Sequence, residues 1–208
     1  MEDPLRAGGR APGLNLIETF AADAPAARIG RHLTRMQRSA TALGWGFDEA
    51  VARALLAAHE GAALRLRLTL DAGGGFALAH APLPPPATEW RVQVAAQRLN
   101  SADPWLRLKS TRRASHDSAR AALPGGVDEA ILLNERGEVC EGTFSTLFFD
   151  RGRGMCTPPL SSGLLPGILR EEMIEGGARE EVLPATDLPD VRLWLGNSLR
   201  GLIPARLV

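Results

Sequence analysis

The chain has 208 residues, of which 45% are apolar, and its 24 basic and 24 acidic side chains give a formal net charge of zero. It is long enough for one large or two small domains with packed cores. Its scattered arginines form none of the basic stripes with which proteins bind nucleic acid or anionic membrane surfaces. No apolar run reaches the roughly 18 residues that a membrane-spanning helix needs. We therefore expect a globular protein that binds a small molecule, and neither nucleic acid nor a membrane.

The cysteines and the first residues bear on the cellular compartment. Cys140 and Cys156 are not spaced as a CxxC pair and have no histidines close by in the sequence, so we expect neither a disulfide nor a metal site. The first residues lack the charged and apolar regions of a secretion signal. These features predict two reduced thiols and a cytoplasmic protein.

The first half of the chain predicts a small α/β domain over residues 14–100. It follows a flexible N-terminal arm at 1–13, which is rich in Gly, Pro and Arg and shows no hydrophobic period. The apolar run at 14–20 predicts a buried strand. Apolar side chains then recur three and four residues apart, which predicts an amphipathic helix from Arg28 that Gly44 ends. Most arginines of this helix are expected in solvent, with the alternative that one points inward to an anion: Arg28, Arg31, Arg35 and Arg38.

One more helix and three strands are expected in this half. Asp48 is a suitable N-cap for a helix at 47–60 that Gly61 would end. Residues 64–70 alternate strictly, which places Arg65 and Arg67 on one face of a strand. They either grip a substrate carboxylate or, as we favour, lie on a solvated face. A glycine turn at 71–75, a strand at 76–80, a proline-rich crossing at 82–86, a strand at 90–96 and a linker at 100–104 complete the half.

Lys109 is the most unusual residue of the second domain, which we expect over residues 101–208. It is the only lysine among 24 lysine and arginine residues, and the residues before it, Trp105, Leu106 and Leu108, are apolar. Arg stays protonated at any working pH, whereas a desolvated Lys amine can lose its proton and attack a carbonyl group. The scarcity of lysine therefore suggests a chemical role, and an ordinary surface lysine is the alternative.

The rest of the second domain predicts a sheet with two short helices. A helix is expected at 115–123, strands at 129–133 and 143–149, and a turn at 134–137 between them. Glu141 lies in this sheet beside Gly142, and a buried carboxylate there would need a partner. After a proline-broken loop at 155–162, a turn at 163–170 opens a helix to Gly176, whose first N–H groups favour an anion. The stretch 195–201 ends a strand with Ser198 and Arg200.

One cofactor suits this combination of a reactive amine, a carboxylate, a helix N-terminus, an arginine and a serine in a glycine-containing loop. Pyridoxal 5'-phosphate needs a lysine for its aldehyde, an acid that keeps its ring nitrogen protonated, and donors for its phosphate. Seven segments in order also carry a resemblance: LIETF, HLTRMQRSA, LRLRL, LKSTRR, DEAILLNERGEVCEGTFSTLFF, TPPLSSGLLPGILR and LGNSLRGL. From Leu14 to the C-terminus the chain resembles the class IV aminotransferases, which are fold-type IV pyridoxal-phosphate enzymes. Within that family it is most similar to the 4-amino-4-deoxychorismate lyases.

The resemblance implies an α/β (α+β) fold of two α/β domains with the cofactor at their junction, commonly in a homodimer. By that resemblance Lys109 would bind the cofactor covalently and act as general base, Glu141 would pair with the pyridine nitrogen, and Arg35 would hold the phosphate. Ile168 and Leu169 would add backbone N–H groups, and Ser198 its hydroxyl. Thr19 would assist proton transfer. The candidates for the substrate carboxylates are Arg65, Arg67, Arg107 and Arg200.

The implied activity is conversion of 4-amino-4-deoxychorismate to 4-aminobenzoate and pyruvate, a step of folate biosynthesis. The alternatives are an aminotransferase for branched-chain or D-amino acids, which shares the first steps, and a family member without catalysis. Stand-alone relatives begin with an extra strand pair that this chain lacks, and Thr146 stands where Asn is common. The chain also has no tyrosine, where relatives commonly have one after the lysine. Here Ser115 and His116 lie in that vicinity, and His116 either replaces its hydrogen bond or, as we favour, is an ordinary exposed helix residue.

Overall fold

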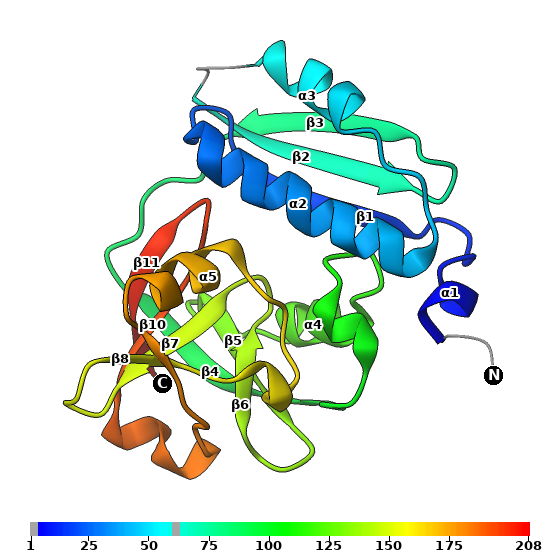
Figure 1. Ribbon diagram of the computed structural model, residues 1–208. Helices are drawn as coiled ribbons and strands as arrows, with labels where there is room; N and C mark the ends of the chain where they lie inside the picture. Colours follow the sequence, from blue (N-terminus) through cyan, green and yellow to red (C-terminus); the bar gives the residue numbers. More distant parts are fainter. Residues whose placement is uncertain (1–3, 60–62) are drawn as a thin grey trace. The chain divides into compact units, whose positions relative to one another are not determined.

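The computed structural model describes residues 4–59 and 63–208, a mixed α/β chain whose contacts divide it into two compact units (Figure 1). Unit 1 comprises Met1–Pro85 and Leu108–Arg112, and unit 2 comprises Pro86–Arg107 and Arg113–Val208. This division differs from the predicted boundary after Asn100. The strand predicted at 90–96 joins the sheet of unit 2, because Trp90 and Val92 are buried in that unit's core.

Unit 1 contains a three-stranded antiparallel sheet in the order β1-β2-β3, formed by β1 (Asn15–Ala21), β2 (Leu64–Asp71) and β3 (Phe76–Pro82). The predicted alternation is confirmed, since Leu66, Leu68 and Leu70 are buried while Arg65 and Arg67 are exposed. The glycine turn between β2 and β3 is confirmed as well. Asp71 Oδ1 accepts hydrogen bonds from the N–H groups of residues 73 and 75, and Gly74 has a φ of 82°, which glycine adopts without strain.

The two longer helices of unit 1, α2 (Ala26–Leu43) and α3 (Glu49–Ala57), pack against β1 and β3 respectively (Figure 1). Gly44, with a φ of 75°, caps the C-terminus of α2 as predicted. Asp48 caps α3, because its carboxylate accepts from the N–H groups of Ala50 and Val51. Helix α3 ends at Ala57, before the predicted end at 60, and the predicted stop at Gly61 lies outside the described residues.

The N-terminal segment is not the flexible arm that we expected. Helix α1 (Pro4–Gly8) forms there and packs against α2. Pro4 occupies the first helical position, where its missing N–H group costs nothing. Gly9 is buried, its carbonyl accepts from the indole N–H of Trp45 at 3.2 Å, and a Cβ on it would lie 3.2 Å from Leu43. Glycine therefore lets this segment approach α2 closely, since a larger residue would require Leu43 to shift by a few tenths of an ångström.

Unit 2 contains an eight-stranded mixed sheet in the order β6-β5-β4-β11-β10-β7-β8-β9. Its parallel pairs are β4–β5, β11–β4 and β8–β9. The predicted strand at 143–149 starts only at residue 146, because residues 143–145 form a turn around a buried carboxylate described below. The strands are β4 (Trp90–Leu99), β5 (Glu129–Asn134), β6 (Val139–Gly142), β7 (Thr146–Asp150), β8 (Met155–Thr157), β9 (Arg179–Glu180), β10 (Arg192–Asn197) and β11 (Gly201–Leu207).

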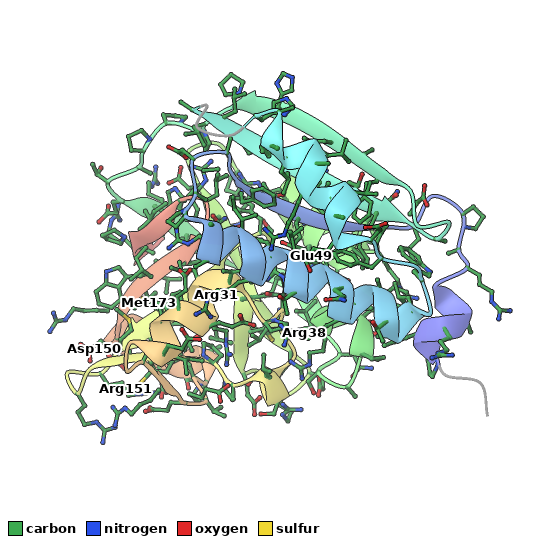
Figure 2. All side chains as sticks on the ribbon, turned by 45° about the horizontal axis from the view of Figure 1, so that its top comes forward. Arg31, Arg38, Glu49, Asp150, Arg151 and Met173 are labelled. Atoms are coloured by element: carbon green, nitrogen blue, oxygen red, sulfur yellow. The ribbon has the colours of Figure 1, made fainter. Side chains whose placement is uncertain are left out.

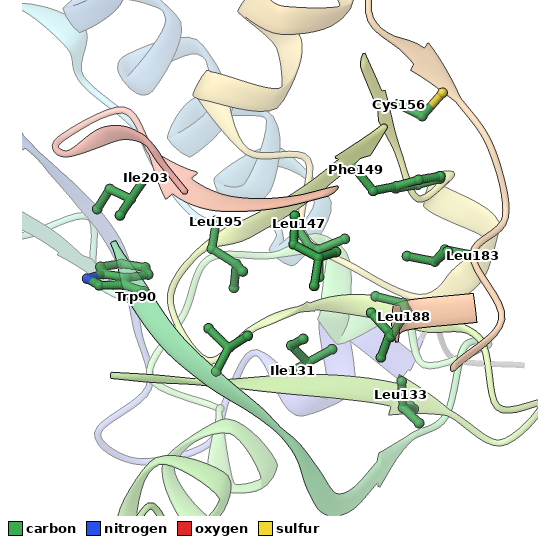
Figure 3. Close-up of a cluster of buried hydrophobic side chains, with 13 residues drawn as sticks. Trp90, Ile131, Leu133, Leu147, Phe149, Cys156, Leu183, Leu188, Leu195 and Ile203 are labelled. Atoms are coloured by element: carbon green, nitrogen blue, oxygen red, sulfur yellow. The ribbon is translucent and has the colours of Figure 1, made fainter. Parts of the chain in front are cut away.

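Helix α4 (Ala114–Ala121) packs against β4 and β5, and α5 (Ile168–Glu175) packs against β10; both lie close to the predicted positions. Three 3-10 helices complete the unit: η1 (Pro104–Arg107), η2 (Leu160–Ser162) and η3 (Ala185–Asp190). The predicted linker at 100–104 therefore lies within unit 2. Figure 3 shows the main core of this unit, in which the strands bury Trp90, Ile131, Leu147, Phe149 and Leu195.

None of the helices within residues 4–59 and 63–208 is long and apolar enough to cross a membrane. In that same part of the chain, no cluster of three or more His, Cys, Asp or Glu side chains could hold a metal ion. Cys140 and Cys156 are both buried and have no disulfide partner, which agrees with the expectation of two reduced thiols.

Candidate active site

The predicted site residues fall into the two units. Unit 1 holds Lys109, Thr19, Arg35, Arg65 and Arg67, and unit 2 holds the other six. The expected position of the cofactor between two domains stays a prediction. The six residues of unit 2 are Arg107, Glu141, Ile168, Leu169, Ser198 and Arg200.

Lys109 lies on a short extended segment beside β1. The N–H of Ile17 donates to the Lys109 carbonyl at 2.8 Å, and the N–H of Thr111 donates to the Asn15 carbonyl at 2.8 Å. These bonds flank an antiparallel bridge between Leu16 and Ser110. The lysine is half-buried, and the sheet fixes its backbone. A fixed backbone suits a nucleophile, which must be held in a defined position.

A buried ion pair joins β1 to α2 in the same unit. Arg35 Nε donates to Glu18 Oε1 at 2.8 Å and Nη2 donates to Oε2 at 2.7 Å, which is a bidentate contact. His32 Nδ1 lies 2.5 Å from Oε2 of the same carboxylate. All three side chains are at least 95% buried. Among the four arginines of α2, Arg35 is thus the one that points inward, while Arg38 is exposed and Arg31 half-buried (Figure 2).

The charges in this cluster set its protonation. Burial raises the pKa of Glu18, but the charges of Arg35 and His32 and their hydrogen bonds outweigh burial and lower that pKa to about 2. Burial also lowers the pKa of His32, with smaller contributions from the positive charges of Arg35 and Lys109, while Glu18 opposes the shift. At neutral pH the cluster is a carboxylate, a guanidinium and a neutral imidazole whose Nδ1–H is the donor. That Arg35 also holds a phosphate stays a prediction.

Thr19 and the two arginines of β2 share one face of the sheet in unit 1. Thr19 lies directly opposite Arg67 in the β1–β2 pair, and Ala21 lies opposite Arg65. Residues that are directly opposite in an antiparallel pair point to the same face. Thr19 is half-buried and both arginines are exposed. The structure therefore places Thr19 and Arg67 as neighbours on one face of the sheet, opposite to the face that carries Glu18.

Glu141 on β6 is the buried carboxylate of unit 2. His116 Nε2 on α4 lies 2.9 Å from its Oε1, and the N–H of Leu165 donates to its Oε2 at 3.1 Å. The favoured interpretation of His116 as an ordinary exposed helix residue is wrong, because its side chain is only 15% exposed and contacts Glu141. Helix periodicity could not show this, because it does not tell which strand a helix faces.

Glu129 is a buried carboxylate that sequence reasoning missed. It accepts hydrogen bonds from the N–H and the hydroxyl of Thr143 at 3.1 and 2.5 Å, and from the hydroxyl of Ser145 at 2.9 Å. These bonds fix the turn between β6, which carries Glu141, and β7. The signal was present in the sequence, since a glutamate that begins the otherwise apolar run EAILL must find partners when the strand is buried.

Helix α5 presents its N-terminus without a side-chain cap. Its N-cap is Gly167, which makes no side-chain hydrogen bond, and the first N–H groups of a helix have no acceptor within it. A Cβ on Gly167 would lie 2.7 Å from Thr146 Oγ1, so glycine at this position leaves room for the Thr146 side chain at the start of the helix. Ile168 and Leu169 are the first two helical residues, as the predicted phosphate contact requires.

Of the remaining predicted residues of unit 2, Ser198 and Arg200 lie in the turn after β10, and Arg107 ends η1. Asn197 Oδ1 accepts from the N–H groups of residues 199 and 200, which fixes the turn that contains Ser198. The Arg200 guanidinium carbon lies 5.7 Å from the Trp90 ring centroid. Arg107 donates to the Leu164 carbonyl at 3.0 Å. Burial and the nearby Arg170 lower the pKa of Arg107, while Glu141 opposes this.

Comparison with known proteins decides the family. A family model described as amino-transferase class IV matches residues 16–208. The chain belongs to this family. Its members are pyridoxal-phosphate-dependent enzymes that include aminotransferases and aminodeoxychorismate lyases.

Individual relatives divide between these two activities. A probable branched-chain-amino-acid aminotransferase of Thermotoga maritima is 31% identical over 192 residues, which cover 85% of this chain and 70% of the relative. The structure of a putative amino-acid aminotransferase from Mesorhizobium loti is 41% identical with a TM-score of 0.87, covering 94% of this chain and 100% of that one. The 4-amino-4-deoxychorismate lyase of Pseudomonas aeruginosa is 26% identical with a TM-score of 0.82, covering 100% and 87%.

The residues present fit the cofactor of this family. Unit 1 supplies the amine of Lys109 on a fixed segment and the guanidinium of Arg35. Unit 2 supplies the carboxylate of Glu141 and the N-terminus of α5, whose N-cap Gly167 makes no side-chain hydrogen bond. An amine, a buried acid and a helix N-terminus are the groups that a phosphorylated pyridine aldehyde needs.

Proposed function

We propose that the chain is a pyridoxal-phosphate-dependent lyase that converts 4-amino-4-deoxychorismate into 4-aminobenzoate and pyruvate. The pairing of Thr19 with Arg67 carries this proposal. The substrate has two carboxylates, one on the ring and one on the enolpyruvyl group, and arginine is the side chain best suited to bind them. Two neighbouring residues on one sheet face, a threonine and an arginine, offer one side chain for proton transfer and one for carboxylate binding.

When bound, the cofactor supplies an aldehyde that captures the substrate amine and a ring that withdraws electrons from the adjacent carbon. Lys109 Nζ takes the proton from the carbon that bears the substrate nitrogen. Glu141 accepts a hydrogen bond from the ring nitrogen and keeps it protonated. Arg35, the N–H groups of Ile168 and Leu169, and the Ser198 hydroxyl hold the phosphate. The bond between the ring carbon and the enolpyruvyl oxygen would then break, which leaves an aromatic ring. The released enolpyruvate would gain one proton on its methylene carbon to become pyruvate, and Thr19 would assist this proton transfer.

An aminotransferase is the second candidate. The Thermotoga maritima and Mesorhizobium loti relatives, which are both named as aminotransferases, favour it. A transaminase would use the same lysine, carboxylate and phosphate-binding groups. It would need one carboxylate contact rather than two. It would also not need the Thr19 hydroxyl for proton transfer to a released enolpyruvate.

The first experiment follows the absorbance of the purified protein with pyridoxal 5'-phosphate. We expect a visible or near-ultraviolet band that Lys109→Ala abolishes and that Arg112→Ala, on the same segment, leaves in place. Addition of aminodeoxychorismate should then release pyruvate. Turnover of branched-chain or D-amino acids with a 2-oxoacid, without pyruvate from aminodeoxychorismate, would establish the aminotransferase instead. Absence of any Lys109-dependent band would overturn both assignments.

Thr19→Val tests the hydroxyl directly. We expect pyruvate release to slow about 100-fold, the smaller end of what a positioned proton-transfer group contributes, while the absorbance band stays. Thr69→Val is the matched control, because Thr69 lies opposite Ile17 on the same sheet face. Equal rates for Thr19→Val and the control would contradict the role of Thr19.

We further propose that the chain forms a homodimer, as members of this family commonly do. Light scattering on the purified protein measures its mass, and a mass of one chain would contradict the proposal.

A further inference from the structure

The two hydrogen bonds of Glu141 come from separate parts of unit 2. His116 on α4 contacts Oε1, and the backbone N–H of Leu165, between η2 and α5, contacts Oε2. An ionised carboxylate only accepts hydrogen bonds, so Nε2 of His116 carries the hydrogen. One donor on each oxygen fixes the plane of the carboxylate and leaves each oxygen able to accept a second bond.

Both donors are anchored by the same small hydrophobic cluster. Its members include Ala119, Cys140 and Leu164, all at least 98% buried. Ala119 lies three residues after His116 and therefore on the same helix face, Cys140 directly precedes Glu141, and Leu164 directly precedes Leu165. Each partner of the contact is thus one residue or one helical turn from this cluster, which holds α4, β6 and the segment after η2 together.

From this arrangement we propose that His116 is a positioning residue for Glu141. It orients the carboxylate, through the Nε2–H to Oε1 hydrogen bond, toward the ring nitrogen of the cofactor. The inference rests on the proposed function, because the role of Glu141 belongs to that proposal. Partners that orient a ligating side chain commonly change ligand affinity without touching the ligand.

The test compares His116→Leu with His116→Gln. Leucine removes the donor, whereas the glutamine side-chain amide has similar reach and can donate to Glu141. We expect the affinity of the apoprotein for pyridoxal 5'-phosphate to fall about 10-fold in His116→Leu, as when a hydrogen bond to a charged group is lost, and to recover in His116→Gln. Ser118→Leu, an exposed position of the same helix, is the matched control and should bind like the wild type.

A second readout needs no cofactor. When His116 no longer holds Oε1, the bond from the Leu165 N–H to Oε2 loosens, so hydrogen exchange at the Leu165 amide should speed up in His116→Leu and not in His116→Gln. A purely structural role predicts instead a lower melting temperature for His116→Leu with unchanged cofactor affinity. That result would overturn the inference.

A double-mutant cycle with Glu141→Gln completes the test. If His116 acts through Glu141, His116→Leu should weaken cofactor binding little further in the Glu141→Gln background. An equal loss in both backgrounds would contradict the inference. If the wild type shows the Lys109-dependent band and His116→Leu does not change the affinity for the cofactor, only the inference about His116 is wrong. If the wild type shows no such band, both the proposed function and this inference are wrong.

Discussion

At the scale of single residues, the Glu18–Arg35 pair is a buried ion pair of unit 1. Both charges are withdrawn from water, and a bidentate contact with two short hydrogen bonds compensates for that loss. His32 completes the partners of the carboxylate. A buried charge that loses its partner has no water to replace that partner. Substitution of either residue is therefore expected to destabilise the fold strongly.

Glu18→Gln should therefore lower the free energy of unfolding by about 3–5 kcal/mol, the range for a buried charge left without its partner. Glu49→Gln is the matched control. Glu49 pairs with Arg53 on α3, with both side chains about half exposed, and such pairs contribute roughly 0–1 kcal/mol. Urea unfolding of both variants measures this difference in the free energy of unfolding. Similar losses in the two variants would contradict the expectation that the buried charge needs its partner.

The residues to which we assign chemical roles were largely visible in the sequence, while their partners were not. Lys109 stood out as the only lysine, and Glu141 as an acid beside a glycine in a strand. Glu18 binds a side chain 17 residues away on a helix, and His116 contacts one 25 residues away. Such pairs depend on which helix face meets which strand, and local periodicity leaves that undetermined.

At the scale of elements, hydrophobic period and turn residues predicted most helices and strands. The strand at 64–70, the Asp48 cap and the Gly44 stop are confirmed. Errors arose where a long-range contact decided the outcome. Residues 143–145 look like strand, yet Glu129 draws them into a turn. Helix α1 forms in a Gly-rich segment because α2 provides a surface for it.

Two glycines show how an element's surroundings reverse the effect of one substitution. A Cβ on Gly196 in β10 would collide with the Gly201 carbonyl, whereas a Cβ on Gly30 in α2 would meet nothing within 4 Å. We expect Gly30→Ala to raise the free energy of unfolding by about 0.5–1 kcal/mol, because alanine favours helix. Gly196→Ala should lower it by about 1–3 kcal/mol, as overpacking does.

Thermal unfolding of the two variants beside the wild type is the measurement. Gly196→Ala should also weaken cofactor binding, because the turn after β10 carries Ser198 and Arg200. A stabilised Gly196→Ala protein would show that β10 and β11 can separate at that point without cost.

At the scale of the whole molecule, the order of seven segments predicted the family, and the match over residues 16–208 confirms it. The division into units was harder to predict. Trp90 begins a strand that follows the unit 1 hairpin in sequence, yet the parallel partners of that strand are β5 and β11. Lys109 lies in unit 1 although Arg107 and Arg113 lie in unit 2. Parallel pairing joins residues distant in sequence, so the order of elements alone did not predict it.

The ionisable groups together predict how stability depends on pH. Burial lowers the pKa of His32 from 6.5. Burial raises the pKa of Glu18, but the charges of Arg35 and His32 and their hydrogen bonds outweigh burial and lower it to about 2. Hydrogen bonds lower the pKa values of Glu135 and Glu138 to about 2. Lowered pKa values mean that the unfolded chain binds more protons in acid, so stability falls as pH drops. As pH falls, His32 should be the first group to lower the stability, below pH 6.5, and the carboxylates should lower it further below pH 4.5.

The two thiols determine how stability depends on pH under alkaline conditions. Burial raises the pKa values of Cys140 and Cys156 above 9.0, so the unfolded chain releases these protons first and stability falls above that pH. We expect a plateau of the urea midpoint between the two limits at constant ionic strength. His32→Asn keeps a neutral donor for Glu18 but cannot titrate, so it should extend the plateau toward acid until the carboxylates protonate. A variant whose midpoint falls in parallel with the wild type from pH 6.5 would show that His32 is not the group that titrates first.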